Sequence, residues 1–130
     1  MKPRIVAAVL AGGEGLRFWP LSTPERPKQF LDLSGEGTLL QLTLRRLENF
    51  VAPEDVFILT QERYTPLVRA QAPAVASDRI IPEPLLRDTA AAIALAAGII
   101  ARRAPGSVMA VLPSDHGIRN VAGFQATLAD

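Results

Sequence analysis

The chain has 130 residues with 14 basic and 13 acidic side chains, so its formal net charge is only +1. Its hydrophobic fraction of 48% and charged fraction of 21% are typical of a folded domain and exclude the disordered and fibrous classes. The balanced charge gives no basic surface for nucleic acid, and the absence of cysteine excludes disulfides, thiolate metal sites and cysteine nucleophiles. We therefore expect one domain at most, with a small-molecule partner and no nucleic acid.

Two apolar stretches, at 5–11 and 90–101, are the candidates for contact with a membrane. Both are much shorter than the roughly 20 residues that a helix needs to cross a bilayer. The first stretch runs into Gly-Gly and then Glu14 and Arg17, so we interpret it as a buried strand rather than a signal-peptide core. We expect no membrane segment and take the cytoplasm as the default location.

Strand-like and helix-like patterns alternate along the chain. Continuous runs rich in valine and isoleucine indicate strands covered on both faces, whereas apolar residues three and four positions apart indicate helices. The predicted elements are a strand at 4–10, a helix from 38 to about 51, a strand at 55–60, a short helix at 65–71, a strand at 79–81, a helix from 88 or 89 to about 103, a strand at 107–112 and the start of a helix at 121–128. This order predicts the α/β class, with a Rossmann-like parallel sheet, flanking helices and right-handed crossovers.

The helix expected from Thr38 has a clear start signal. Thr38 and Gln41 have the spacing of a capping box, in which each side chain binds the other residue's backbone N–H. The apolar positions recur at helical spacing: Leu40, Leu44, Leu47 and Val51. The polar positions between them are expected to face water: Arg45, Arg46, Glu48 and Asn49.

The segment from Gly12 to Gly37 follows the first strand and carries most of the functional information. It begins with Gly12, Gly13 and Gly15 and contains prolines that exclude a helix. Phosphate suits such a loop because glycines let backbone N–H groups approach its oxygens. Phe18 stands where the dinucleotide fingerprint needs a third glycine, and no Gly-Lys-Ser/Thr completes a P-loop. The glycines alone are equally consistent with a tight turn.

Two cationic side chains in this loop, Arg17 and Lys28, favour phosphate binding over a simple turn. A hydrogen bond from Arg or Lys to phosphate is roughly twice as strong as a neutral one. Both residues lie in a proline-rich loop at the carboxyl end of the first strand, where open α/β sheets bind ligands. Trp19 either stacks on a base or sugar or anchors the loop by packing against the domain.

Asp115 follows the fourth strand, at the same edge of the sheet as the glycine loop. Mg²⁺ prefers one or two carboxylates together with phosphate oxygens and water, so Asp115 is the candidate metal ligand. A turn or helix cap is the alternative role. His116 is the single histidine, and we assign it no catalytic role because a lone histidine beside an aspartate is usually structural.

The segment from Glu83 to Thr89 leads into a helix at the same edge. Pro82 and Pro84 bracket Glu83 in what we expect to be an extended turn. A rigidly held carboxylate can accept hydrogen bonds from the N1–H and the exocyclic amine of guanine, which makes Glu83 the candidate for base recognition. Asp88 and Thr89 are further nucleotide-binding candidates, although both are also common helix caps.

Four motifs carry a resemblance to a known family. They are Leu-Ala-Gly-Gly-Glu-Gly-Leu-Arg-Phe-Trp-Pro-Leu-Ser at 10–22, Pro-Lys-Gln-Phe-Leu at 27–31, Glu-Pro-Leu-Leu-Arg-Asp-Thr-Ala-Ala-Ala-Ile at 83–93 and Leu-Pro-Ser-Asp-His at 112–116. Together they resemble the bacterial mannose-1-phosphate guanylyltransferases. The first motif is shared with sugar-nucleotide pyrophosphorylases generally, whereas Trp-Pro-Leu-Ser with Pro-Lys-Gln-Phe is typical of the mannose branch. Two positions depart from the family pattern, with Phe18 in place of the common Leu and Asp88 where Asn is frequent.

The resemblance implies that GTP and α-D-mannose 1-phosphate react to give GDP-mannose and pyrophosphate, with Mg²⁺ as cofactor. It implies catalytic roles for Arg17, which would hold the β and γ phosphates, and for Lys28, which would bridge phosphate oxygens. It also implies that Asp115 carries the metal. The nucleotide would contact these two cations and eight further residues: Leu10, Ala11, Gly12, Gly13, Gly15, Glu83, Asp88 and Thr89. Asp88 is the least secure of these contacts, because an ionised carboxylate cannot donate a hydrogen bond.

Family members continue well beyond this length, so we interpret residues 1–130 as the N-terminal, nucleotide-binding part of a longer nucleotidyltransferase domain. The sugar pocket and a second metal-binding aspartate would then lie outside it, and self-association into a homo-oligomer stays open. Two other hypotheses remain. One is a pyrophosphorylase for a different nucleotide and hexose 1-phosphate, and the other is a catalytically incomplete nucleotide-binding module.

Overall fold

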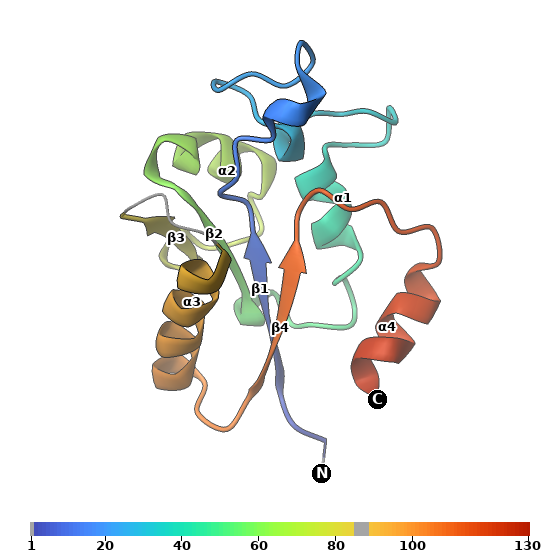
Figure 1. The fold of residues 1–130 in the computed structure, drawn as a ribbon. Helices are drawn as coiled ribbons and strands as arrows, with labels where there is room; N and C mark the ends of the chain where they lie inside the picture. The colour runs from blue at the N-terminus through green and yellow to red at the C-terminus, as the bar shows by residue number, and fades with distance from the viewer. Residues whose placement is uncertain (1, 85–88) are drawn as a thin grey trace.

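The protein is described by a computed structural model that covers residues 2–84 and 89–130 (Figure 1). Its strands are β1 Ile5–Leu10, β2 Val56–Gln61, β3 Ile80–Glu83 and β4 Val108–Pro113. Its main helices are α1 Leu39–Arg45, α2 Thr65–Gln71, α3 Thr89–Arg103 and α4 Val121–Ala129. The predicted α/β class is confirmed, and most element boundaries differ from the prediction by two residues or fewer.

The four strands form one parallel sheet in the order β3-β2-β1-β4. In Figure 1 the arrowheads of β1 and β4 point toward the loop that follows β1. The register places Leu10, the last residue of β1, beside Leu59 of β2 and Pro113 of β4. Because β1 lies between β2 and β4, the segments that follow these strands meet at one edge of the sheet.

Helices cover both faces of the sheet. On one face, α1 and α2 pack over alternate residues of β1 and β2, and Phe124 of α4 adds to this core. On the other face, α3 packs against Val6, Ala8 and Leu59 through small side chains such as Ala96, which is fully buried. The alanine-rich surface of α3 therefore allows the close contact with the sheet that the sequence suggests.

The predicted capping box is present at the start of α1. The Thr38 hydroxyl accepts a hydrogen bond from the Gln41 N–H at 3.2 Å, and the Gln41 side chain accepts one from the Thr38 N–H at 3.0 Å. The helix ends at Arg45, earlier than predicted, and a series of turns reaches Asn49, which has a positive φ of 61°.

The expectation that Arg46 faces water is wrong. Its side chain is buried, with a relative exposure of 4%, because α4 packs over the end of α1. Arg45, the preceding residue, is exposed as predicted.

The expected turn around Glu83 is also wrong, because Pro82 and Glu83 belong to β3 and pair with Thr60 and Gln61. Pro82 is tolerated there because β3 is an edge strand of the described sheet. The long connection between β1 and α1 contains two short 3-10 turns, Leu16–Phe18 and Lys28–Phe30. None of the described helices has the length and hydropathy needed to cross a bilayer.

Candidate functional site

Side chains from distant segments hold the carbonyl groups of the loop after β1. The Ser114 hydroxyl donates to the Leu10 carbonyl at 2.6 Å, and the Thr60 hydroxyl donates to the Ala11 carbonyl at 2.9 Å. The Gln61 amide donates to the Gly12 carbonyl in the same way. The loop is therefore fixed by β2 and β4, the two neighbours of β1 in the sheet.

Gln29 supplies the most central of these contacts. Its side-chain amide, which is buried, donates to the carbonyls of Ala11 at 3.1 Å and Gly13 at 2.8 Å. A further contact comes from Ser22, whose hydroxyl donates to the Gly15 carbonyl at 2.6 Å. The second half of the loop thus folds back and braces the first half.

The loop N–H groups contrast with its carbonyls. Among residues 2–84 and 89–130, no hydrogen-bond acceptor is found for the N–H groups of Gly12, Gly13, Glu14 or Gly15. Successive free N–H groups of this kind form a concave site for anions. Gly15 has a φ of 59°, and a Cβ there would lie only 2.8 Å from Lys28 Cβ, so a side chain at this position would push Lys28 away.

A cavity of about 540 Å³ opens beside Glu14 and Gly15 of this loop. Its lining residues are Glu14, Gly15, Arg17, Phe18, Lys28 and Asp115. The structure thus brings Arg17, Lys28 and Asp115 to one space, although Asp115 lies 87 residues after Lys28 along the chain. A larger hollow of about 740 Å³ lies between the ends of α1 and α2 and is lined largely by apolar side chains, so it lacks a comparable group of cations.

The charged groups of the 540 Å³ cavity are close but weakly paired. Lys28 Nζ lies 4.0 Å from an Asp115 carboxylate oxygen, at the outer limit of an ion pair, and 4.3 Å from the centre of the Phe18 ring. Arg17 has no ion-pair partner within the part of the chain that the structure describes. Cations without a firm protein partner suit a site that receives an anionic ligand.

Glu83 lies against the glycine loop. A Cβ added at Gly12 would collide with a Glu83 carboxylate oxygen, so a side chain there would displace the Glu83 carboxylate. Partial burial raises the pKa of Glu83 above its usual value, because removal from water disfavours the charged carboxylate.

The remaining predicted nucleotide contacts differ from one another in how far they are exposed. Leu10 is half-buried and Ala11 is buried, and the Ala11 N–H already donates to the Leu59 carbonyl at 2.8 Å. Ala11 therefore offers no free backbone donor. Thr89 is exposed at the first residue of α3, and Asp88 lies outside the described residues.

Two further residues at this edge were singled out in the sequence. Trp19 is 74% exposed, so it does not pack against the residues that the structure describes. The His116 side chain is exposed, with Nε2 at 3.6 Å from an Asp115 oxygen, and its backbone carbonyl accepts a hydrogen bond from Arg46.

Asp115 is the residue that could hold a metal ion in this cavity. Among the described residues, no cluster of three or more Asp, Glu, His or Cys side chains is arranged around a metal position. A single carboxylate nevertheless fits Mg²⁺ where a bound nucleotide adds phosphate oxygens and water completes the shell. The half-exposed Asp115 carboxylate is accessible enough to be such a ligand.

The bracing residues were missed in the sequence. Gln29, Gln61, Thr60, Ser22 and Ser114 are neutral, and their acceptors are backbone carbonyls that only the folded chain brings near. A signal was nonetheless available, because Thr60, Gln61 and Ser114 lie at or next to the carboxyl ends of strands, where a buried apolar run changes to polar residues.

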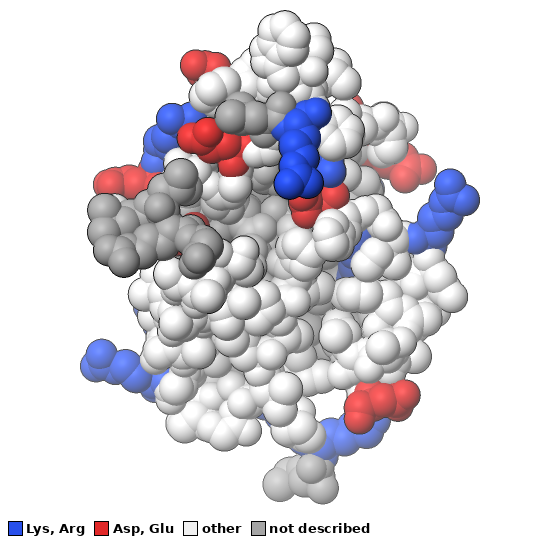
Figure 2. All heavy atoms as spheres, in the orientation of Figure 1, with Lys and Arg blue, Asp and Glu red and all other residues white. Residues whose placement is uncertain are grey.

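Figure 2 shows how charge is distributed on one side of the molecule. Basic and acidic side chains gather at the top, where Figure 1 has the loop after β1, whereas the surface over α3 and β4 is largely without charge. The charged rim therefore coincides with the carboxyl edge of the sheet.

Known proteins are similar to this chain in both sequence and fold. A family model described as nucleotidyl transferase matches residues 6–130. A mannose-1-phosphate guanylyltransferase of Sinorhizobium fredii is 45% identical over 121 residues, covering 91% of this chain and 24% of that protein. The alginate biosynthesis protein AlgA of Pseudomonas aeruginosa is 36% identical over 126 residues, covering 96% of this chain and 26% of that protein.

A solved structure from Thermus thermophilus, described as a mannose-1-phosphate geranyltransferase, matches with a TM-score of 0.87 and 38% identity. It covers 99% of this chain and 37% of that chain. The chain thus spans about a quarter of the length of the curated relatives named above. The resemblance found in the sequence motifs is confirmed, and the chain belongs to the nucleotidyl transferase family.

Proposed function

We propose that the full-length protein forms GDP-mannose and pyrophosphate from GTP and α-D-mannose 1-phosphate. The observation that carries the proposal is the cavity that brings Arg17, Lys28 and Asp115 to one space beside Glu14 and Gly15 of the loop. The names of the relatives supply the substrates. Residues 1–130 would then be the nucleotide-binding part of a longer enzyme.

In this reaction a phosphate oxygen of mannose 1-phosphate attacks the α-phosphorus of GTP in line, and the bond to the β-phosphate oxygen breaks to release pyrophosphate. The protein's contribution is to position the reactants and to neutralise charge. Arg17 would bind the departing β and γ phosphates, and Lys28 would bridge oxygens whose charge increases as the bond breaks. The loop N–H groups would donate to phosphate oxygens without any rearrangement, because the carbonyls of the same loop are already held.

Asp115 would hold Mg²⁺ against the phosphates. When bound, the ion supplies charge neutralisation to the triphosphate and orients it for in-line attack. Asp115 and Lys28 would then both act on the same phosphate chain, and the proposal is supported by their charged atoms lying 4.0 Å apart at one cavity.

Guanine recognition would fall to Glu83. Its carboxylate lies beside Gly12, and an ionised carboxylate can accept both the N1–H and the amine hydrogen bonds of guanine. Adenine offers no N1–H, so this contact favours GTP over ATP.

The test compares nucleotides in a turnover assay with the full-length protein. GTP, ATP, UTP and dTTP are each supplied with mannose 1-phosphate or glucose 1-phosphate, and both pyrophosphate and the sugar nucleotide are measured. We expect turnover with GTP and mannose 1-phosphate to exceed every other pair. A different preferred pair would instead support another pyrophosphorylase, and GTP binding without turnover would support the incomplete nucleotide-binding module.

A further inference from the structure

Arg46 is a buried cation at the end of α1 that the proposed reaction does not use. Its side chain is almost fully enclosed, and within the described residues no carboxylate lies within 4.0 Å of its guanidinium group. Burial accordingly lowers the pKa of Arg46 below its ordinary value. Its Nε atom is also without a hydrogen-bond partner among the residues described.

The other guanidinium nitrogens make two contacts. Nη2 donates to the Thr43 hydroxyl at 3.0 Å, and Nη1 donates to the backbone carbonyl of His116 at 2.9 Å. Thr43 in turn donates to the Leu39 carbonyl one turn earlier in α1, at 2.9 Å. The guanidinium is therefore fixed to its own helix on one side and to the segment after β4 on the other.

Helix α4 covers this contact. The centre of the Phe124 ring lies 5.7 Å from the guanidinium carbon, and the Gln125 amide donates to the Arg46 carbonyl at 2.9 Å. Arg46 thus joins α1, α4 and the segment that carries Asp115, three parts of the chain that are far apart in sequence.

Stability alone is a weak reason for an arginine at this position. A buried charge without a counter-ion costs solvation free energy, and replacement of buried charges by apolar side chains of similar size is often neutral or stabilising. A methionine would fill the same space without that cost. What it could not do is bind the carbonyl next to Asp115.

Hydrogen bonds hold the residue before Asp115 and the backbone of the residue after it. Before it, Ser114 binds the Leu10 carbonyl through its N–H at 3.2 Å and its hydroxyl at 2.6 Å. After it, the His116 carbonyl is bound by Arg46. We propose that Arg46 is a positioning residue, which fixes the backbone after Asp115 so that the Asp115 carboxylate stays in the cavity beside Lys28. The proposal rests on the nucleotide and Mg²⁺ site proposed above for its functional meaning.

The test compares three variants of the full-length protein. Arg46→Met removes both hydrogen bonds and the charge, and Arg46→Lys keeps the charge but shortens the reach. Arg45→Met is the matched control, because Arg45 is the exposed neighbour on the same helix. Amide hydrogen exchange measures how well residues 114–118 are ordered without any ligand. The half-saturating Mg²⁺ concentration in the turnover assay measures how well the Asp115 carboxylate is placed to bind the ion.

For Arg46→Met we expect exchange at 114–118 to become about tenfold faster or more, while exchange in β1 and β2 and the melting temperature stay near wild type. The half-saturating Mg²⁺ concentration should rise by about 10- to 100-fold, as is typical when a group that supports a metal ligand is lost. Arg46→Lys should lie between this variant and wild type, and Arg45→Met should match wild type.

Two results would overturn the proposal. One is exchange at 114–118 that matches the Arg45→Met control, and the other is a uniform increase over the whole domain with a lower melting temperature, which would mark Arg46 as a core residue only. Should Arg46→Met fail to fold, the same criteria apply to Arg46→Lys. A wild-type protein without GTP turnover would remove the proposed function, whereas the exchange comparison would still decide whether Arg46 holds the segment.

Discussion

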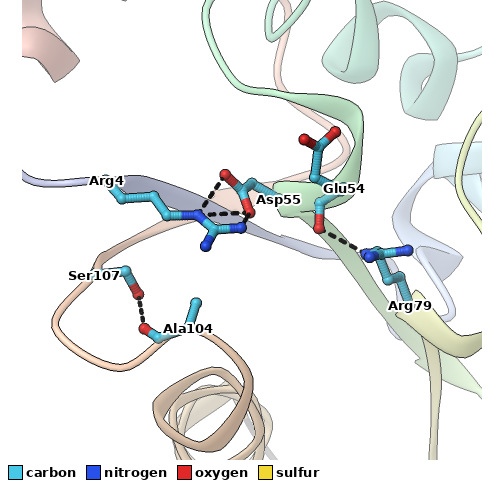
Figure 3. Close-up of polar contacts among 6 residues, drawn as sticks. All are labelled: Arg4, Glu54, Asp55, Arg79, Ala104 and Ser107. Carbon is cyan, nitrogen blue, oxygen red and sulfur yellow. Dashed lines mark hydrogen bonds and ion pairs between the residues drawn. The ribbon is translucent and has the colours of Figure 1, made fainter.

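The two ends of the sheet use the same kinds of residue in opposite ways. At the amino end Arg4 and Arg79 find acceptors within the protein (Figure 3). Arg4 Nε donates to both carboxylate oxygens of the buried Asp55, at 2.9 and 3.0 Å, and Arg79 Nε donates to the Glu54 carbonyl at 2.6 Å. The hydrogen bonds and charge of Asp55 raise the pKa of Arg4 above its ordinary value.

At the carboxyl end, side chains donate hydrogen bonds to the backbone carbonyls of the loop after β1, but the donors of this region lack firm acceptors. The loop N–H groups have no acceptor among the described residues, and the carboxylate partner of Lys28 is 4.0 Å away. The comparison teaches that charge by itself does not mark a site. What distinguishes the carboxyl end is donors that have no acceptor among the described residues, next to carbonyls that side chains hold, an arrangement that suits an anionic ligand.

The largest expected effect comes from removing a cation that lines the 540 Å³ cavity. In the full-length enzyme, Lys28→Ala should lower GDP-mannose turnover by about two orders of magnitude, comparable to the loss of one preorganised donor. Lys2→Ala is the matched control, because Lys2 is the other lysine of the chain and is exposed at the amino end. Steady-state rates near wild type for Lys28→Ala would remove this residue from the site.

The bracing of the loop can be broken separately. Gln29→Leu keeps the side-chain volume but removes the side-chain donor of the Gly13 carbonyl and leaves the Ala11 carbonyl with Thr60 as its only side-chain donor among the described residues, which should lower the free energy of unfolding by about 1–3 kcal/mol. Affinity for GTP should also fall, because the loop N–H groups lose their fixed orientation. Urea denaturation and equilibrium binding measure the two effects, and unchanged values for both would show that Gln29 does not brace the loop.

The Arg4–Asp55 ion pair at the amino end should contribute to stability alone. Asp55→Asn removes the charge that Arg4 binds and places an amide against its N–H groups, so the melting temperature should fall by a few degrees. The rate per folded molecule should equal that of wild type because the pair lies at the far end of the strands. A loss of turnover beyond the loss of folded protein would contradict the separation of the two ends.

A smaller effect is expected from Phe18, whose ring lies over the Lys28 ammonium group. Phe18→Leu keeps an apolar side chain and removes the cation–π contact, which is worth about 0.5–1 kcal/mol at exposed sites. The KM for GTP should rise about two- to fivefold with kcat unchanged, since 1.4 kcal/mol corresponds to a factor of about ten. Phe18→Tyr keeps the ring and should behave as wild type, and an equal change in both variants would exclude the cation–π contact as the cause.

The smallest effect concerns the pH dependence of stability. Folding raises the pKa of Glu83, so the folded state binds this proton more tightly than the unfolded state does. Stability is therefore lost as the pH rises from the ordinary glutamate pKa to the raised one, and the loss persists above it. Glu83→Gln should remove that loss, which makes the variant slightly more stable than wild type at neutral pH but not at a pH below the ordinary pKa. Denaturation curves at the two pH values measure the difference, and an equal difference at both would exclude the titration of Glu83 as its source.

Local sequence signals predicted much of the fold. The capping box at Thr38, the span of α2 and the strand runs are set by near neighbours, and the structure matches them closely. The approach of Asp115 to Lys28 was also predictable, because parallel strands end at one edge of the sheet. Whether these residues bind a nucleotide and a metal stays a prediction.

Long-range packing accounts for what the sequence could not predict. Arg46 was expected in water because its helix position is polar, and it is buried because α4, which lies 75 residues later in the chain, covers it. Gln29 was missed for the same reason, because its acceptors, the Ala11 and Gly13 carbonyls, lie 18 and 16 residues earlier in the chain. Contacts between residues far apart in the sequence determine whether such side chains are buried. Helical or strand periodicity does not predict these contacts.

The position of β4 beside β1 has a consequence for how the protein is made. Ile5 of β1 pairs with Val108 of β4, so the loop after β1 leaves the ribosome about a hundred residues before the strand that brings Asp115 beside it. Arg17 and Lys28 are therefore synthesised well before Asp115 can join them. If Asp115 holds Mg²⁺ as proposed, its part of the metal site forms only after long-range strand pairing.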